Sequence, residues 1–75
     1  MANLDRSFDV VGQLNQQSQN QIKSVLTKLE GVNHVQFDTG DNKIIVGYTP
    51  GIVNVQILKE TIENQGVDIS DRGDD

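Results

Sequence analysis

The chain of 75 residues contains no cysteine, no tryptophan and a single proline. Without cysteine it can form no disulfide, no thiolate metal site, no iron–sulfur cluster and no cysteine nucleophile. Basic residues are also scarce, because six Lys and Arg face eleven Asp and Glu, which gives a formal net charge of −5 at pH 7. An acidic balance disfavours phosphate backbones and anionic lipid surfaces, so we expect no nucleic acid partner.

Long apolar runs are missing as well. No stretch approaches the roughly 20 apolar residues that span a bilayer. The first residues, MANLDRSFD, lack the basic start and the apolar stretch of a signal peptide. We therefore expect a cytoplasmic protein without membrane insertion. The length allows one domain, and a hydrophobic content of 35% is enough to fold it if the apolar residues are well patterned.

The first part of the chain predicts a strand followed by a helix. Apolar and polar residues alternate over residues 7–11, which indicates a half-buried strand, and residues 1–6 are an expected disordered lead-in. In the carboxamide-rich tract that follows, Ser18 and Gln21 fit a capping box that starts the helix. Gly31 is the expected end of the helix. The apolar face of this helix consists of Ile22, Val25, Leu26 and Leu29.

The second part predicts a hairpin, a second helix and a last strand. The two hairpin strands span residues 32–37 and 44–48, and the last strand spans residues 67–69. The residues of the tight reversal are Thr39, Gly40, Asp41 and Asn42. Pro50 and Gly51 mark the next turn. Asn54 is the expected N-cap of the second helix, which Gly66 ends.

The order strand, helix, strand, strand, helix, strand is the split βαβ pattern. Each strand–helix–strand unit needs a right-handed crossover, which leaves room for another strand between its two strands. We therefore predict an α+β, ferredoxin-like βαββαβ sandwich over residues 7–70, with a four-stranded antiparallel sheet and two helices on one face. Residues 71–75 form an expected acidic tail. The predicted core consists of Phe8, Val10, Ile22, Leu26, Leu29, Val35, Phe37, Val46, Leu58 and Ile62.

The spacing of one set of residues is more specific than the fold pattern. It comprises Gly12, Ile22, the segment Leu29-Glu30-Gly31-Val32, Val35, Phe37, the run Lys43 to Tyr48, Ile62 and Gly66. This set resembles the heavy-metal-associated (HMA) domain of copper chaperones and metal-pumping ATPases, from about Phe8 to Ile69. In that family the first loop reads Gly-Met-x-Cys-x-x-Cys. The resemblance therefore implies a metal-transport scaffold with a site in the first loop.

The resemblance places the two cysteines of the family at Asn15 and Ser18, and its methionine at Gln13. The aromatic or lysine that often follows the last glycine of the family falls on Val67. Cu(I) is a soft ion that prefers thiolate or thioether sulfur, whereas hydroxyl and amide oxygens are hard, neutral donors. We therefore expect a degenerate site that binds neither copper nor zinc in the family's way, and no cofactor.

Other polar groups give weaker candidates for a metal site. His34 is the only histidine, and the alternation of its strand predicts that it points away from the helices as an ordinary surface residue. The spacing of the carboxylates near the end of the chain does not match a calcium loop; these are Asp68, Asp71, Asp74 and Asp75. Ser18 has no histidine base on its own element, so we expect no enzyme.

The leading hypothesis is a diverged copper-chaperone-like HMA domain that works as a protein-interaction or accessory module in metal handling. Its interaction loop consists of Gln13, Leu14, Asn15, Gln16, Gln17, Ser18 and Val67. The resemblance implies a metal-transporting ATPase domain as partner, with an acidic surface of Glu30, Glu60 and Glu63, and an exposed sheet edge allows a homodimer. The alternative is a metal ion carrier that uses non-cysteine ligands such as His34, completed by a second chain.

Overall fold

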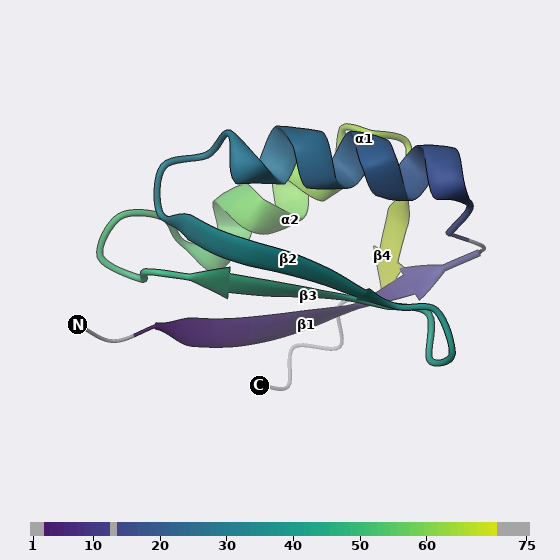
Figure 1. The fold of residues 1–75 in the computed structure, drawn as a ribbon, viewed down its shortest axis with the longest axis horizontal. Coiled ribbons are helices and arrows are strands. Elements are labelled where there is room, and N and C mark those ends of the chain that lie inside the picture. Colours follow the sequence, from purple (N-terminus) through teal and green to yellow (C-terminus); the bar gives the residue numbers. More distant parts are fainter. Residues whose placement is uncertain (1–2, 13, 71–75) are drawn as a thin grey trace.

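The computed structural model describes residues 3–12 and 14–70. Its elements are β1 (Leu4–Val11), α1 (Gln16–Thr27), β2 (Val32–Asp38), β3 (Lys43–Tyr48), α2 (Val55–Glu63) and β4 (Asp68–Ser70). The strands form one antiparallel sheet in the order β2-β3-β1-β4. Both helices cover the same face of this sheet (Figure 1). The predicted ferredoxin-like βαββαβ sandwich is thereby confirmed.

The first strand begins earlier than the sequence pattern predicts. Leu4 pairs with Tyr48 and Asp5 with Gly47, so the expectation of a disordered lead-in is wrong for residues 4–6. β3 offers backbone partners along this whole stretch, and this pairing outweighs the weak alternation of the side chains. Met1, Ala2 and the expected acidic tail, residues 71–75, lie outside the described residues.

The core lies between the sheet and the two helices. Eight of the ten predicted core residues are buried, whereas Leu29 and Phe37 are only partly buried. Leu29 follows the last residue of α1, and Phe37 lies on an edge strand, so each packs against the core from one side only. Four further residues complete the buried set, namely Leu14, Ile44, Tyr48 and Val53.

The two helices differ from their predicted bounds at their ends. α1 ends at Thr27, and a turn separates it from Gly31, whose positive φ of 101° fits the expected glycine conformation. Asn54 caps α2 as predicted, because its Oδ1 accepts from the backbone N of Ile57 at 2.9 Å. β4 is shifted by one residue from the predicted range.

The β2–β3 turn confirms the predicted hairpin. Asn42 has a φ of 57°, a left-handed conformation that asparagine tolerates better than most residues. Asp38 Oδ1 accepts from the backbone N of Asp41 at 3.2 Å and so closes the turn from the other side. Within residues 3–12 and 14–70, neither helix is long and apolar enough to cross a membrane.

Candidate functional site

The loop between β1 and α1 starts at Gly12, and the β2–β3 turn holds that start in place. Gly12 has a φ of 99°, which favours glycine. The backbone N of Val10 donates to the carbonyl of Asn42 at 3.0 Å, and the side-chain amide of Asn42 donates back to Val10 O at 2.8 Å and to Gly12 O. Gln13, the next predicted site residue, lies outside the described residues.

Leu14 anchors the middle of the loop. Its side chain is 9% exposed and belongs to the core cluster, and Gln19 Nε2 donates to its carbonyl at 3.0 Å. The side chain of Leu14 therefore packs inward, and its contribution to a contact surface remains a prediction. A large apolar residue directly before a helix cap commonly fixes the angle at which the chain enters the helix, and this signal could have placed Leu14 in the core.

Asn15 is the N-cap of α1. Its Oδ1 accepts from the backbone N of Ser18 at 2.7 Å, and the backbone N of Gln19 donates to Asn15 O at 3.0 Å. The prediction that Ser18 caps the helix is wrong, because Ser18 lies inside α1 as the third helical residue. An extended asparagine whose side-chain oxygen reaches the third helical N–H is a favourable cap, and it starts the helix three residues earlier.

The two positions that the resemblance assigns to cysteine are therefore joined to each other by a hydrogen bond. The oxygen at position 15 is engaged by the amide of residue 18, and neither side chain carries a negative charge. The first turn of α1 contains no acidic residue either. The loop thus offers a cation neither thiolate nor carboxylate, which are the donors that compensate for its lost hydration.

The rest of the predicted interaction loop surrounds this cap. Gln16 and Gln17 are exposed at the start of α1, and Gln16 Nε2 donates to Asn20 Oδ1 at 3.1 Å. Val67 is partly buried and precedes Asp68, the backbone partner of Val11, so it lies beside the start of the loop. The fold therefore brings Val67 to the loop from the far end of the chain.

His34 lies on the sheet face away from the helices, as predicted, and does not reach the loop. Its Nε2 is 3.5 Å from Asp5 Oδ1, and its ring covers Gly47, where an added Cβ would overlap the imidazole. Asp5 is seven residues from Gly12 along β1, which corresponds to about 23 Å at the rise of a strand. Among the described residues, no three His, Cys, Asp or Glu side chains are grouped to hold a metal ion.

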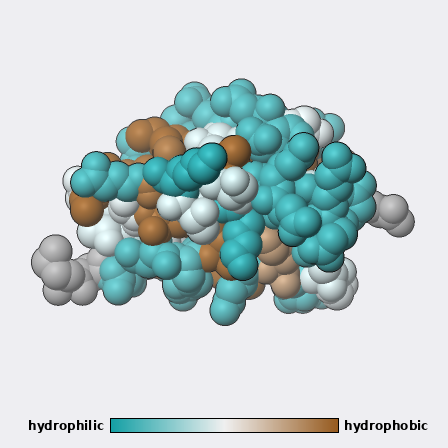
Figure 2. Space-filling model, turned by 45° about the horizontal axis from the view of Figure 1, so that its top comes forward, coloured by the Kyte–Doolittle hydropathy of each residue, from teal (hydrophilic) through white to brown (hydrophobic). Residues whose placement is uncertain are grey.

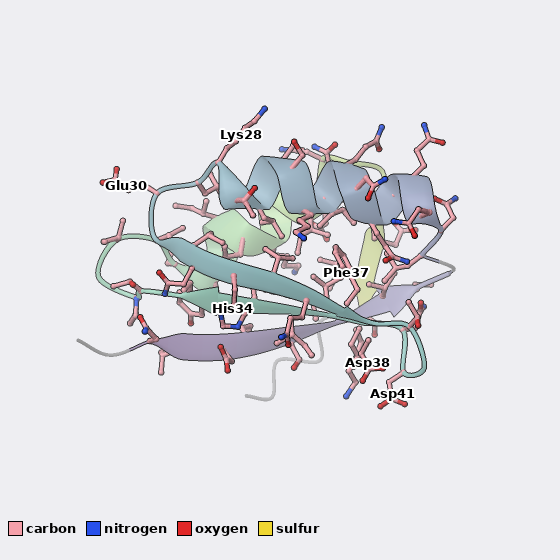
Figure 3. All side chains as sticks on the ribbon, viewed as in Figure 1. Lys28, Glu30, His34, Phe37, Asp38 and Asp41 are labelled. Atoms are coloured by element: carbon pink, nitrogen blue, oxygen red, sulfur yellow. The ribbon has the colours of Figure 1, made fainter. Side chains whose placement is uncertain are left out.

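The predicted acidic surface is spread over two parts of the molecule. Glu30 lies in the turn after α1, where Figure 3 shows it pointing away from the helices and the sheet, and Glu60 and Glu63 belong to α2. All three are exposed, and Glu60 Oε2 accepts from Gln56 Nε2 at 3.0 Å. Their role as a partner surface remains a prediction. Of the four carboxylates near the chain end, only Asp68 lies within the described residues.

The chain is similar to known copper proteins in sequence and in structure. No family model matches it. It is 33% identical over 66 residues to the copper chaperone CopZ of Staphylococcus haemolyticus, which covers 88% of this chain and 97% of that protein. The copper chaperone CopZ of Staphylococcus epidermidis is 36% identical over 50 residues, covering 67% of this chain and 74% of that protein.

Solved structures show the same fold. A CopZ metallochaperone matches with a TM-score of 0.83 at 24% identity and covers 89% of this chain and 100% of its own. The N-terminal domain of a potential copper-translocating P-type ATPase from Bacillus subtilis, solved in its Cu(I)-loaded state, matches with a TM-score of 0.84 at 26% identity. That match covers 92% of this chain and 86% of the ATPase domain.

Proposed function

The chain belongs to the CopZ family of copper chaperones, and we propose that it acts there as a protein-interaction module in metal handling that takes up no copper. The observation that carries the proposal is the hydrogen bond between Asn15 Oδ1 and Ser18 N. This bond closes the loop with the side chain that stands in a ligand position. The scaffold is kept, and the donors that would hold the ion are replaced by a helix cap.

The chemistry of copper supports a loop without metal. Cu(I) is held by soft sulfur ligands, and the chain of 75 residues has no cysteine. The amide oxygen of Asn15 is a hard donor, and it is already engaged by a backbone N–H at 2.7 Å. Binding a cation there would cost the cap of α1 and return no charge compensation.

A domain of a metal-transporting ATPase is the proposed partner. The amino-terminal domain of the Bacillus subtilis ATPase shares the fold of this chain at 26% identity, so contacts between two domains of this type need no new architecture. We assign the contact to the loop that ends at Ser18 and to the exposed start of α1, including Gln16 and Gln17. The matching relatives are copper chaperones, so we propose a role without catalysis. We also propose that the chain meets its partner in the cytoplasm.

A Cu(I) titration against a chelator of about micromolar affinity under reducing conditions tests the loss of the site. We expect the wild-type chain to leave the chelator complex intact. The double variant Asn15→Cys/Ser18→Cys restores two thiolates at the family spacing, and we expect it to take up copper stoichiometrically. The double variant Asn15→Ser/Ser18→Ala removes the same two side chains without adding sulfur, and it serves as the matched control.

Stoichiometric uptake by the wild-type chain would overturn the proposed loss. The carrier alternative gives a different signal, namely shifts of amide resonances confined to His34 and Asp5 on addition of Zn²⁺ or Ni²⁺. A second titration, with the metal-binding domain of a copper-translocating ATPase and no metal, tests the partner. Resonances of residues 14–18 are expected to shift, and an unchanged spectrum would exclude this contact.

A further inference from the structure

β2 is an edge strand of the sheet, and it carries no Lys, Arg, Asp or Glu before Asp38. Within residues 3–12 and 14–70, it pairs with β3 on one side, and no other strand pairs with its outer edge. Figure 1 shows this edge below α1 at the front of the molecule. Charged side chains usually protect such edges from pairing with another strand, so an uncharged edge is a candidate contact surface.

The regular part of β2 is centred on Gln36. A bulge between Val32 and His34 disturbs the start of the strand, whereas His34 to Asp38 pair with β3 residue by residue. Alternation along this stretch places Val35 and Phe37 on the helix side and the other three residues on the open face of the sheet. Gln36 is the middle residue of this five-residue stretch, and an apolar, helix-facing residue lies on each side of it.

Apolar surface accompanies this edge on the helix side. Phe37 is only partly buried, although it packs against the core. It lines a shallow groove together with Val35 and with Gln19 of α1. Figure 2 shows brown, hydrophobic surface below the hydrophilic helix layer, and Figure 3 shows Phe37 on the helix side and Asp38 on the opposite side of β2. A strand laid along the edge would cover this surface.

We propose that β2 pairs antiparallel with β2 of a second copy of this chain, about a two-fold axis at Gln36. In this register Val35 lies opposite Phe37 of the second copy, and the two-fold axis repeats this apolar pair. His34 lies opposite Asp38 of the second copy, which gives two pairs of complementary groups on the open face. Gln36 lies opposite its own copy, and its side-chain amide can both donate and accept there.

The other side of the sheet does not allow the same pairing. β4 covers only residues 9–11 of β1, so Leu4 to Phe8 are the part of β1 beyond it. A two-fold axis perpendicular to a sheet pairs residues of the same face. On this stretch an axis at Arg6 would set Arg6 opposite Arg6 and an axis at Asp5 would set Asp5 opposite Asp5, and like charges directly opposite are destabilising. An axis at Ser7 would leave only Arg6 to Phe8 to pair, because Asp5 would then fall opposite Asp9, which already pairs with β4. β2 is thus the edge on which a chain of net charge −5 can meet its own copy.

This inference rests on the proposed function only in that the chain works through protein contacts. It assigns a second copy to the β2 edge, whereas the ATPase domain is assigned to the loop at Asn15. Copper enters neither the pairing nor its test. A failed copper or ATPase experiment therefore does not overturn the β2 pairing. A failed pairing experiment likewise does not overturn the proposed function.

Sedimentation velocity of the whole chain from about 10 µM to about 1 mM tests the pairing. We expect wild-type chain to self-associate, and Gln36→Lys and Gln36→Glu each to weaken the association at least about tenfold by placing like charges on the axis. A mixture of these two variants sets Lys opposite Glu, and it should associate at least about tenfold more tightly than either variant alone. Gln56→Lys, the same change at an exposed residue of α2, is the matched control and should associate as wild type does.

The circular dichroism spectrum of each variant checks that the exposed substitutions leave the fold intact. A wild-type chain that stays monomeric at about 1 mM would overturn the inference. Unchanged association of both Gln36 variants would overturn it as well, and so would a mixture that associates no better than its components. Hydrogen exchange gives an independent readout, because protection of the β2 amides should rise with protein concentration in the wild type and in Gln56→Lys, but not in either Gln36 variant by itself.

Discussion

At the residue scale, the side chain at position 15 determines where α1 begins. Asn15 adopts an extended conformation with φ −82° and ψ 172°, and its oxygen accepts the N–H of Ser18. The resemblance assigns a metal ligand of the HMA family to this position, where asparagine supplies a helix cap. Asn42 supports the same loop from the β2–β3 turn through hydrogen bonds to Val10 and Gly12. Hydrogen bonds from Asn42 and to Asn15 therefore fix both ends of the loop.

Replacement of Asn15 by alanine tests the cap. Asn15→Ala removes the acceptor of the Ser18 N–H, and we expect it to lower the free energy of unfolding by about 1 kcal/mol. Ser18→Ala keeps the backbone N–H and should stay within about 0.5 kcal/mol of the wild type. Urea denaturation followed by circular dichroism measures both values. Equal losses in the two variants would contradict the assignment of the cap to Asn15.

At the element scale, two glycines connect helices to strands under different constraints. Gly66 has a φ of 84°, and a Cβ built there meets nothing within 4 Å. Gly31 has a φ of 101°, and its Cβ would lie 2.9 Å from side-chain atoms of both Ile52 and Val53. The turn after α1 is therefore packed against the loop before α2, whereas the turn after α2 is open.

Alanine at these two glycines separates backbone strain from packing. We expect Gly66→Ala to cost about 1–2 kcal/mol, the price of a left-handed conformation for a residue with a Cβ. Gly31→Ala should cost at least about 1 kcal/mol more, because Ile52 and Val53 must also move. Thermal unfolding of the two variants gives the comparison. A Gly31→Ala variant as stable as Gly66→Ala would show that Ile52 and Val53 can move aside without a loss of stability.

At the scale of the whole molecule, stability depends on one layer of apolar contacts between the sheet and the helices. A domain of this size has about 4–11 kcal/mol of stability, and no disulfide supplements it. Leu26 of α1 and Leu58 of α2 are fully buried between the sheet and the helix layer. A CopZ metallochaperone shares the fold that this layer supports, with a TM-score of 0.83 at 24% identity.

Truncation of one buried leucine should consume a large part of this stability. We expect Leu26→Ala to lower the free energy of unfolding by about 2–5 kcal/mol through lost burial and a residual cavity. Leu4→Ala, at a position 46% exposed on β1, is the control and should cost less than about 1 kcal/mol. Chemical denaturation of both variants measures the difference, and similar losses would contradict the assigned core.

The sequence alone determined the order of elements, the hairpin and the cap of α2. Hydrophobic periods and the turn residues around Asn42 and Asn54 are local signals, and the structure confirms the elements that they predict. The absence of cysteine, placed on the spacing of the family, also predicts a degenerate site at Asn15 and Ser18. These inferences need no long-range contact, since the period of a helix or strand is visible within a few residues.

Only the tertiary structure shows which side chain caps α1 and which one packs into the core near Asn15. The start of β1 at Leu4 depends on the pairing with β3, and the burial of Leu14 depends on the helix layer above it. The capping-box pattern predicts Ser18 as the cap, but Asn15 also belongs to a residue type that caps helices well, and the structure places the cap there. The extended backbone of Asn15 and its hydrogen bond from Ser18 N identify Asn15 as the cap. Contacts between distant segments therefore fix the start of the loop, through the bonds of Asn42 to Val10 and Gly12, whereas the cap at its end is a local hydrogen bond.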